Sequence, residues 1–228
     1  MSDLLETMEI ETAPKPAAAV IWMHGLGADG NDFAPIVPEL KLGGAPAIRF
    51  VFPHAPMMPV TINNGHVMRA WYDVSFGDLE GTTRRADEQG VRASQTAIDK
   101  LIAREIQRGI APRNIVIAGF SQGGAIALQT GLRYPQRLAG IMALSTYLPL
   151  GETLADEASA PNRDIPIFYA HGAHDPVIPL AMATASRAKL SALGYAVEWH
   201  EYPMQHAVCL EEIQAIGAWL RKAISAER

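Results

Sequence analysis

The sequence predicts an α/β fold, in which a mostly parallel sheet carries helices on both of its faces. Short apolar runs rich in β-branched residues alternate along the chain with longer segments of helical periodicity. The first of these runs, residues 17–23, is apolar throughout, as a strand buried on both faces is. A chain of 228 residues fits one large domain of this class, and we expect residues 1–228 to form it.

The strands are expected where the apolar runs lie. The run 17–23 ends at the turn His24-Gly25-Leu26-Gly27, and the run 47–52 is stopped by Pro53. Segment 4–12 is expected to add an edge strand. Four further strands are predicted at 114–119, 138–144, 165–170 and 195–201.

The helices are expected between these runs. In residues 86–108, Val91, Ile98 and Leu101 fall on one face, and Gly109 marks the end of the helix. Three more helices are predicted at 122–133, 180–193 and 208–224.

The stretch from Pro53 to Thr83 is too long for an ordinary connection. We expect it to be irregular, and to form a partly ordered cover over a binding site. It carries apolar side chains that a disordered segment would lack, namely Met57, Met58, Val60, Ile62, Met68 and Trp71.

Composition excludes several classes of protein. Net charge is −5, which argues against nucleic-acid binding because that requires a basic patch. No run approaches eighteen apolar residues, so no stable membrane insertion is expected. The acidic start MSDLLETMEIET does not resemble a signal peptide, and Cys209 is the single cysteine. We therefore expect a cytoplasmic protein without disulfides.

A strand–turn–helix motif supplies the candidate nucleophile. Gly119-Phe120-Ser121-Gln122-Gly123 matches G-x-S-x-G, and it joins the predicted strand 114–119 to the predicted helix 122–133. The glycines leave room for a sharp turn that exposes the serine. The alternative is an ordinary glycine-rich turn with a capping serine. The context favours Ser121 as the nucleophile of an α/β hydrolase.

Two backbone N–H groups are expected to stabilise the oxyanion. One belongs to Gln122, which follows the nucleophile, and the other to the loop after an early strand. Leu26 in the turn HGLG is the best candidate for the second. The alternative is that this turn merely follows a strand.

The order Ser…Asp…His along the chain selects the remaining two residues of a triad. His206 lies in the loop after the last predicted strand, whereas His200 lies within that strand. Asp175 follows the strand 165–170, at the sheet edge where catalytic groups gather, whereas Asp164 precedes it. The alternatives are a capping or surface histidine for His206 and a turn-forming aspartate for Asp175.

Two other groups of residues are interpreted as structural. His171 and His174 beside Asp175 could suggest a metal site, but paired loop histidines more often form hydrogen bonds in the scaffold. Cys209 is expected on the apolar side of the helix 208–224, as a small buried core residue.

Several motifs together resemble one known family. HGLGADGNDF, RAWYD at 69–73, GFSQGGAIAL, HGAHDPVIP and the late histidine are similar to the bacterial carboxylesterase, acyl-protein thioesterase and lysophospholipase branch of α/β hydrolases. This resemblance spans the chain and implies Ser121, Asp175 and His206 as the triad, with Leu26 and Gln122 at the oxyanion hole. It also implies a homodimer.

The activity predicted from these residues is hydrolysis of short- to medium-chain acyl esters through an acyl-enzyme, with no metal or organic cofactor. An acyl-protein thioesterase or a lysophospholipase would use the same triad, and a non-catalytic binding module is a remote alternative. Substrate selection is assigned to apolar residues, namely Leu26, Met57, Met58, Ile62, Met68, Trp71 and Leu148.

Overall fold

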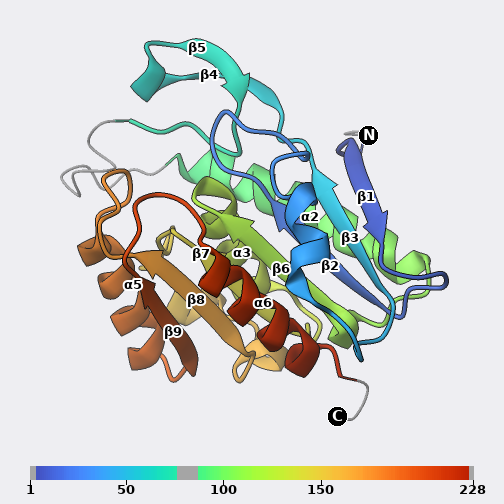
Figure 1. Cartoon of the computed structure of the whole chain (residues 1–228). Helices are drawn as coiled ribbons and strands as arrows, with labels where there is room; N and C mark the ends of the chain where they lie inside the picture. Colours follow the sequence, from blue (N-terminus) through green and yellow to red (C-terminus); the bar gives the residue numbers. More distant parts are fainter. Residues whose placement is uncertain (1–3, 76–86, 226–228) are drawn as a thin grey trace.

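The computed structural model describes residues 4–75 and 87–225, and its centre is a seven-stranded sheet (Figure 1). The strand order is β1-β3-β2-β6-β7-β8-β9, with β1 antiparallel to β3 and every other neighbouring pair parallel. This confirms the predicted fold class. The strands are β1 Thr7–Glu11, β2 Ala18–Met23, β3 Ile48–Pro53, β6 Ile115–Phe120, β7 Gly140–Leu144, β8 Ile167–Gly172 and β9 Val197–Tyr202.

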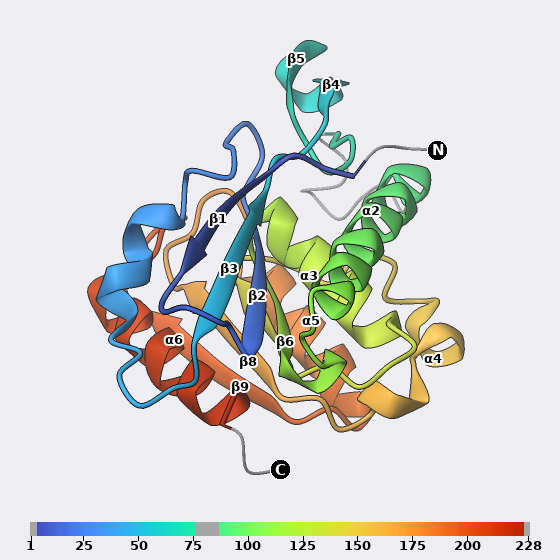
Figure 2. The same cartoon turned by 90° about the vertical axis from the view of Figure 1, so that its right-hand side faces the viewer.

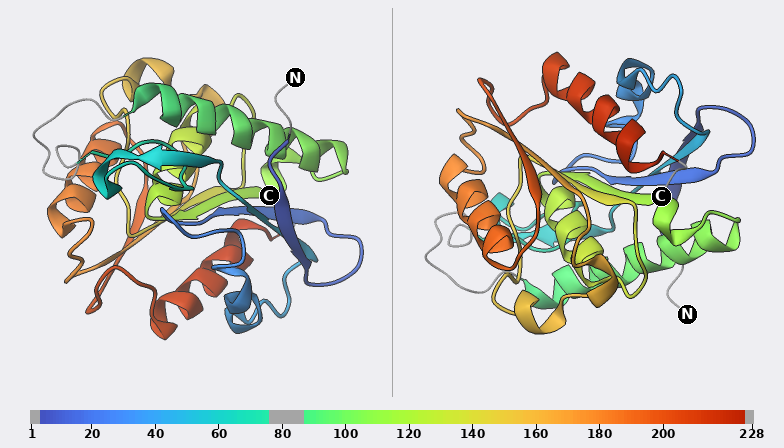
Figure 3. Two further views of the ribbon diagram at one scale, coloured as in Figure 1. Left: turned by 90° about the horizontal axis from the view of Figure 1, so that it is seen from above. Right: turned by 90° about the horizontal axis from the view of Figure 1, so that it is seen from below.

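Two layers cover the sheet, which is why its central strands are apolar along their whole length. All six residues of β2 are buried, with Ala19 and Ile21 on one face and Val20 and Trp22 on the other. Figure 3 shows the two layers on opposite sides of the sheet. The layer over Ile21 contains α2 Glu88–Gln107, α3 Gln122–Arg133 and α5 Leu180–Ala192, and the other contains α6 Leu210–Ala223 and the 3₁₀ helix Ala34–Leu40.

The helices agree with the prediction to within two residues at each end. One further short helix, α4 Leu154–Glu157, lies in a region for which none was predicted. Within the two described ranges, no helix is long and apolar enough to cross a membrane.

The long connection after Pro53 is more regular than expected. Its strands β4 Met57–Val60 and β5 His66–Arg69 form an antiparallel hairpin, in which Met58 pairs with Met68. Asn64 and Gly65 turn the chain in the left-handed region, at φ 55° and 75°. Figures 1 and 2 show the hairpin projecting beyond the sheet. The prediction of an irregular segment was therefore wrong for this part, and residues 76–83 lie outside the described chain.

Candidate active site

Ser121 lies on the sharp turn between β6 and α3. Its φ of 55° and ψ of −120° are unusual for a residue with a side chain. Two hydrogen bonds fix the turn to the end of β7 and the residues after it. Ser121 N–H donates to Leu144 O at 2.8 Å, and Thr146 Oγ1 donates to Ser121 O at 2.6 Å.

The two glycines of the turn are required by close packing. A Cβ on Gly119 would lie 2.2 Å from the carbonyl carbon of Gly123, and a Cβ on Gly123 would lie 2.4 Å from Met23 O. Any other residue at either position would force the backbone apart. The strand–turn–helix setting predicted from G-x-S-x-G is therefore present.

A continuous chain of hydrogen bonds joins the three residues expected to form a triad. His206 Nε2 lies 2.9 Å from Ser121 Oγ, and His206 Nδ1 lies 2.7 Å from Asp175 Oδ2. An ionised carboxylate only accepts hydrogen bonds, so Nδ1 carries the proton and Nε2 accepts from the serine hydroxyl. The three residues follow β6, β8 and β9, whose carboxyl ends meet at one edge of the sheet.

The alternatives to His206 and Asp175, namely His200 and Asp164, lie away from Ser121. His200 on β9 stacks on Phe168, with ring centroids 4.6 Å apart, and its Nε2 lies 3.0 Å from Glu198 Oε1. Asp164 precedes β8 and forms an ion pair with Arg137. The structure thus separates both from Ser121, as their sequence positions predict.

His171 lies on β8, four residues before Asp175. It is fully buried, its Nε2 lies 2.9 Å from Ile178 O, and burial lowers the pKa of its ring. His174 is exposed. Among the residues described here, no three histidine, cysteine or carboxylate side chains gather as metal ligands would.

Cys209 is not the buried core residue that the sequence suggested. The helix α6 begins at Leu210, so Cys209 occupies the N-cap position and is half-buried. Burial raises the pKa of its thiol, which keeps it protonated at neutral pH.

Leu26 and Gln122 flank Ser121 in one cavity. Gln122 is the first residue of α3, so its N–H has no acceptor one turn earlier and lies at the positive end of the helix. Across residues 4–75 and 87–225, neither its N–H nor that of Leu26 donates to a protein acceptor. Both groups are therefore available to an oxyanion.

The side chain of Gln122 has a further contact that sequence reasoning missed. Its Oε1 accepts from Trp71 N–H at 2.8 Å, and its Nε2 donates to Tyr72 O at 2.6 Å. The indole of Trp71 in turn donates to His24 O at 2.9 Å. The chain that follows the hairpin is thereby fixed to Gln122 and to the start of the turn that contains Leu26.

The cavity at Ser121 has a volume of about 210 Å³. Of the residues expected to select the substrate, it includes Leu26 and Ile62. Tyrosines 72 and 147 share a hydrogen bond between their hydroxyls at 2.7 Å. The described residues that line the cavity are Leu26, Ile62, Asn63, Tyr72, Val74, Ser121, Gln122, Tyr147, Val177 and Ile178.

The other expected acyl-binding residues are not part of this lining. Met57 is 59% exposed on the hairpin, Trp71 is buried in the core, and Leu148 packs against the core. Met58 and Met68 face each other across β4 and β5. Three lining residues that the sequence did not suggest lie at the carboxyl edge of the sheet, which was the available signal: Tyr147 follows β7, and Val177 and Ile178 follow Asp175. The other three, Asn63, Tyr72 and Val74, lie in or after the hairpin and had no such signal.

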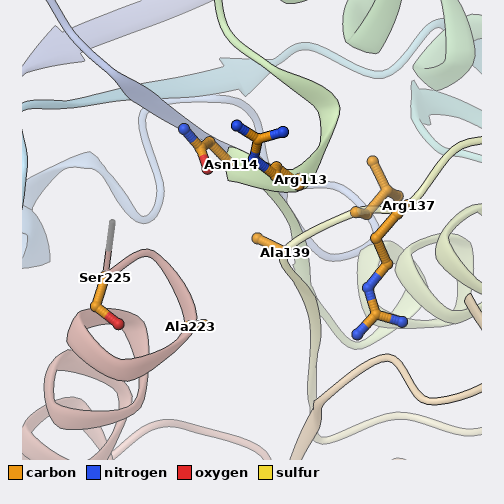
Figure 4. A pocket seen from close by; sticks show the side chains of 7 residues that line it. Arg113, Asn114, Arg137, Ala139, Ala223 and Ser225 are labelled. Carbon is orange, nitrogen blue, oxygen red and sulfur yellow. The ribbon is translucent and has the colours of Figure 1, made fainter. Parts of the chain in front are cut away.

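A second cavity lies at the opposite end of the sheet, before β6 and β7. It has a volume of about 390 Å³ and lies between Arg113, Arg137 and Ser225. In Figure 4 the two guanidinium groups point away from each other, and that of Arg137 is paired with Asp164. The arginines therefore do not converge on one anion.

Comparisons with known proteins agree with this geometry. A family model described as phospholipase/carboxylesterase matches residues 5–224, a span that includes Ser121, Asp175 and His206. Acyl-protein thioesterase 1 of Neurospora crassa is 40% identical over 221 residues, which cover 94% of this chain and 90% of that protein. Acyl-protein thioesterase 1 of Gibberella zeae is 38% identical over 218 residues, 93% of each. The crystal structure of SOBER1 from Arabidopsis thaliana has a TM-score of 0.83 at 30% identity, covering 91% of this chain and 99% of that one.

Proposed function

This chain belongs to the phospholipase/carboxylesterase family and is a serine hydrolase, and we propose that it is a thioesterase that removes acyl groups from cysteine side chains. The hydrogen-bond chain Ser121–His206–Asp175 beside an apolar cavity carries the proposal. The sequence alone favoured an oxygen ester as substrate. Two relatives at 38–40% identity, both named acyl-protein thioesterase 1, favour a thiol leaving group instead.

Acylation begins with Ser121. Its hydroxyl oxygen attacks the acyl carbonyl carbon while His206 Nε2 takes the hydroxyl proton. The carbonyl oxygen becomes negative, and the N–H groups of Leu26 and Gln122 donate to it. Asp175 keeps the Nδ1–H tautomer of His206 and stabilises its cationic form.

The tetrahedral intermediate collapses when the carbon–sulfur bond breaks. His206 gives its proton to the leaving thiolate, and the acyl group stays on Ser121 as an ester. Water then attacks that ester with His206 again as the base, and the fatty acid leaves as Ser121 regains its proton. Every proton in the cycle is carried by these side chains and water.

The cavity fits the acyl part of such a substrate. Ile62, Val74, Val177 and Ile178 supply apolar surface, which gains free energy when a hydrocarbon chain covers it. Its volume of about 210 Å³ lies below the ~300 Å³ at the lower end for drug-sized ligands. A short acyl chain therefore fills it.

The test uses one acyl group on two leaving atoms. A peptide with S-hexanoyl cysteine and the same peptide with O-hexanoyl serine are compared by kcat/KM, with Ser121→Ala as the blank. We expect turnover of both, with the thioester favoured. Tenfold preference for the serine ester would overturn the thioesterase assignment while leaving the serine hydrolase in place.

A further inference from the structure

The ring of His24 is held in one tautomer by two backbone groups. Ala55 N–H donates to Nε2 at 3.1 Å, so that nitrogen carries no proton. Nδ1 lies 2.7 Å from Gly25 O, a carbonyl that only accepts, so Nδ1 carries the proton. The ring is 1% exposed and packs beside Trp71, with centroids 5.3 Å apart.

The carbonyl that His24 holds belongs to the same peptide unit as the N–H of Leu26. This peptide bond is trans, and a trans unit directs its C=O and its N–H to opposite sides. Because Nδ1–H fixes Gly25 O, the Leu26 N–H must point away from the ring. Leu26 lines the cavity that contains Ser121 and Gln122.

The peptide units on either side are fixed by other residues. Trp71 Nε1–H donates to His24 O at 2.9 Å, and Gly27 N–H donates to Arg69 O at 2.9 Å. Because both neighbouring peptide units are fixed, a movement of the whole loop cannot reorient the Leu26 peptide. Gly25 O accepts from the His24 ring at 2.7 Å and from Ala28 N–H at 3.3 Å, and the contact from the ring is the shorter of the two.

We propose that His24 is the positioning residue of the oxyanion hole, and that its Nδ1–H sets the direction of the Leu26 N–H. This inference rests on the proposed function, because that function assigns Leu26 to the oxyanion. His24 itself touches no reacting atom. It acts before the reaction, by holding the donor where the charge will develop.

The role requires a neutral ring. Burial lowers the pKa of His24, and the ionisable groups that act on it are Asp29, His54 and Arg69. A protonated ring would place an Nε2–H against the N–H of Ala55, and two donors cannot bond to each other. The neutral form is the one that fits both contacts.

Two substitutions separate the two contacts of the ring. Asparagine places its amide nitrogen where histidine has Nδ1, so His24→Asn keeps a donor to Gly25 O and loses the acceptor for Ala55. Glutamine places its amide where histidine has Nε2, so His24→Gln keeps the acceptor and loses the donor. We expect His24→Asn to retain kcat within a few fold. In His24→Gln, kcat should fall by about tenfold to 10²-fold, at or below the ~10²–10³-fold loss typical of a missing oxyanion donor, with KM little changed.

The outcomes distinguish this proposal from the function on which it rests. An inactive wild-type protein would refute the proposed function. An active wild-type protein with equal losses in the two variants, or with the larger loss in His24→Asn, would show a merely structural histidine. If either variant fails to fold, ¹⁵N spectra of the histidines in the wild-type protein decide. They should show a protonated Nδ1 and an unprotonated Nε2 for His24, and the opposite tautomer would overturn the proposal.

Discussion

Asp175 holds His206 through one carboxylate oxygen while its other oxygen is fixed by the backbone. Oδ2 lies 2.7 Å from His206 Nδ1, and Oδ1 accepts the N–H groups of Val177 and Ile178 at 2.8 and 2.9 Å. The carboxylate therefore cannot rotate away from the histidine without breaking two further hydrogen bonds. In the proposed mechanism this carboxylate orients the ring and favours its cationic form.

The different partners of the two Asp175 carboxylate oxygens predict the effect of Asp175→Asn. The amide oxygen will keep the two backbone N–H groups, so the amide nitrogen will face His206 Nδ1. That nitrogen is a donor and will force the tautomer with the proton on Nε2, which cannot accept from Ser121. We expect kcat to fall on the order of 10⁴-fold with an unchanged thermal midpoint. A loss below tenfold in the folded variant would remove Asp175 from the mechanism.

The two late histidines provide a matched pair. His206→Gln should lower turnover to the blank level, because among the described residues His206 alone forms a hydrogen bond with Ser121 Oγ. His200→Gln should retain most activity, because His200 stacks on Phe168 within β9. Both variants are compared by kcat/KM on the same thioester. Similar losses in the two proteins would mean that the base is misassigned.

The cavity predicts a dependence on acyl length. Each added methylene should raise kcat/KM by up to about fourfold, equivalent to ~0.8 kcal/mol, until the cavity is full. Ile62→Ala should move the optimum to longer chains, because Ile62 lines the cavity. Met57→Ser is the control, since Met57 is exposed outside that lining. A shift of the optimum in the Met57 variant but not in the Ile62 variant would place the acyl site at Met57 and outside the cavity that Ile62 lines.

Glu212 predicts a dependence of stability on pH. It is fully buried near the start of α6, and burial raises its pKa from 4.5 to about 8. Between these values the unfolded chain loses the proton that the folded protein keeps, so wild-type stability falls as pH rises through this range. Below pH 4.5 both states hold the proton, and above about pH 8 the penalty is constant.

Glu212→Gln removes this penalty because glutamine stays neutral. We expect its thermal midpoint, relative to wild type, to rise between about pH 4.5 and 8 and then to level off, by several degrees at ~2–4 °C per kcal/mol. The neighbouring Glu211 is exposed, so Glu211→Gln is the control. A constant difference between Glu212→Gln and wild type across this range would contradict a buried proton on Glu212.

The sheet was predictable because its central strands are apolar on both faces. The choice of Ser121, Asp175 and His206 was predictable because each of them follows the end of an expected strand. The hairpin was not predictable in the same way. Its strands are four residues long, half-exposed, and interrupted by Pro59, so neither alternation nor a continuous apolar run marks them.

The lining of the cavity was also hidden from the sequence. Trp71 looked like an acyl contact because it is large and apolar, but its indole N–H and its backbone are bound by His24 and Gln122. Val177 and Ile178 looked like ordinary loop residues. Which side of a loop faces a cavity depends on long-range contacts such as these, and no local pattern encodes them.

The central claim is that the Ser121 hydroxyl is the nucleophile. The most direct measurement is to label the wild-type protein with a fluorophosphonate and to map the adduct by peptide mass spectrometry, with Ser121→Ala alongside. We predict one adduct, on Ser121, none in the variant, and loss of hydrolysis that parallels labelling in the wild type. An adduct on another residue, or a folded Ser121→Ala protein that keeps more than a tenth of the wild-type activity, would contradict it.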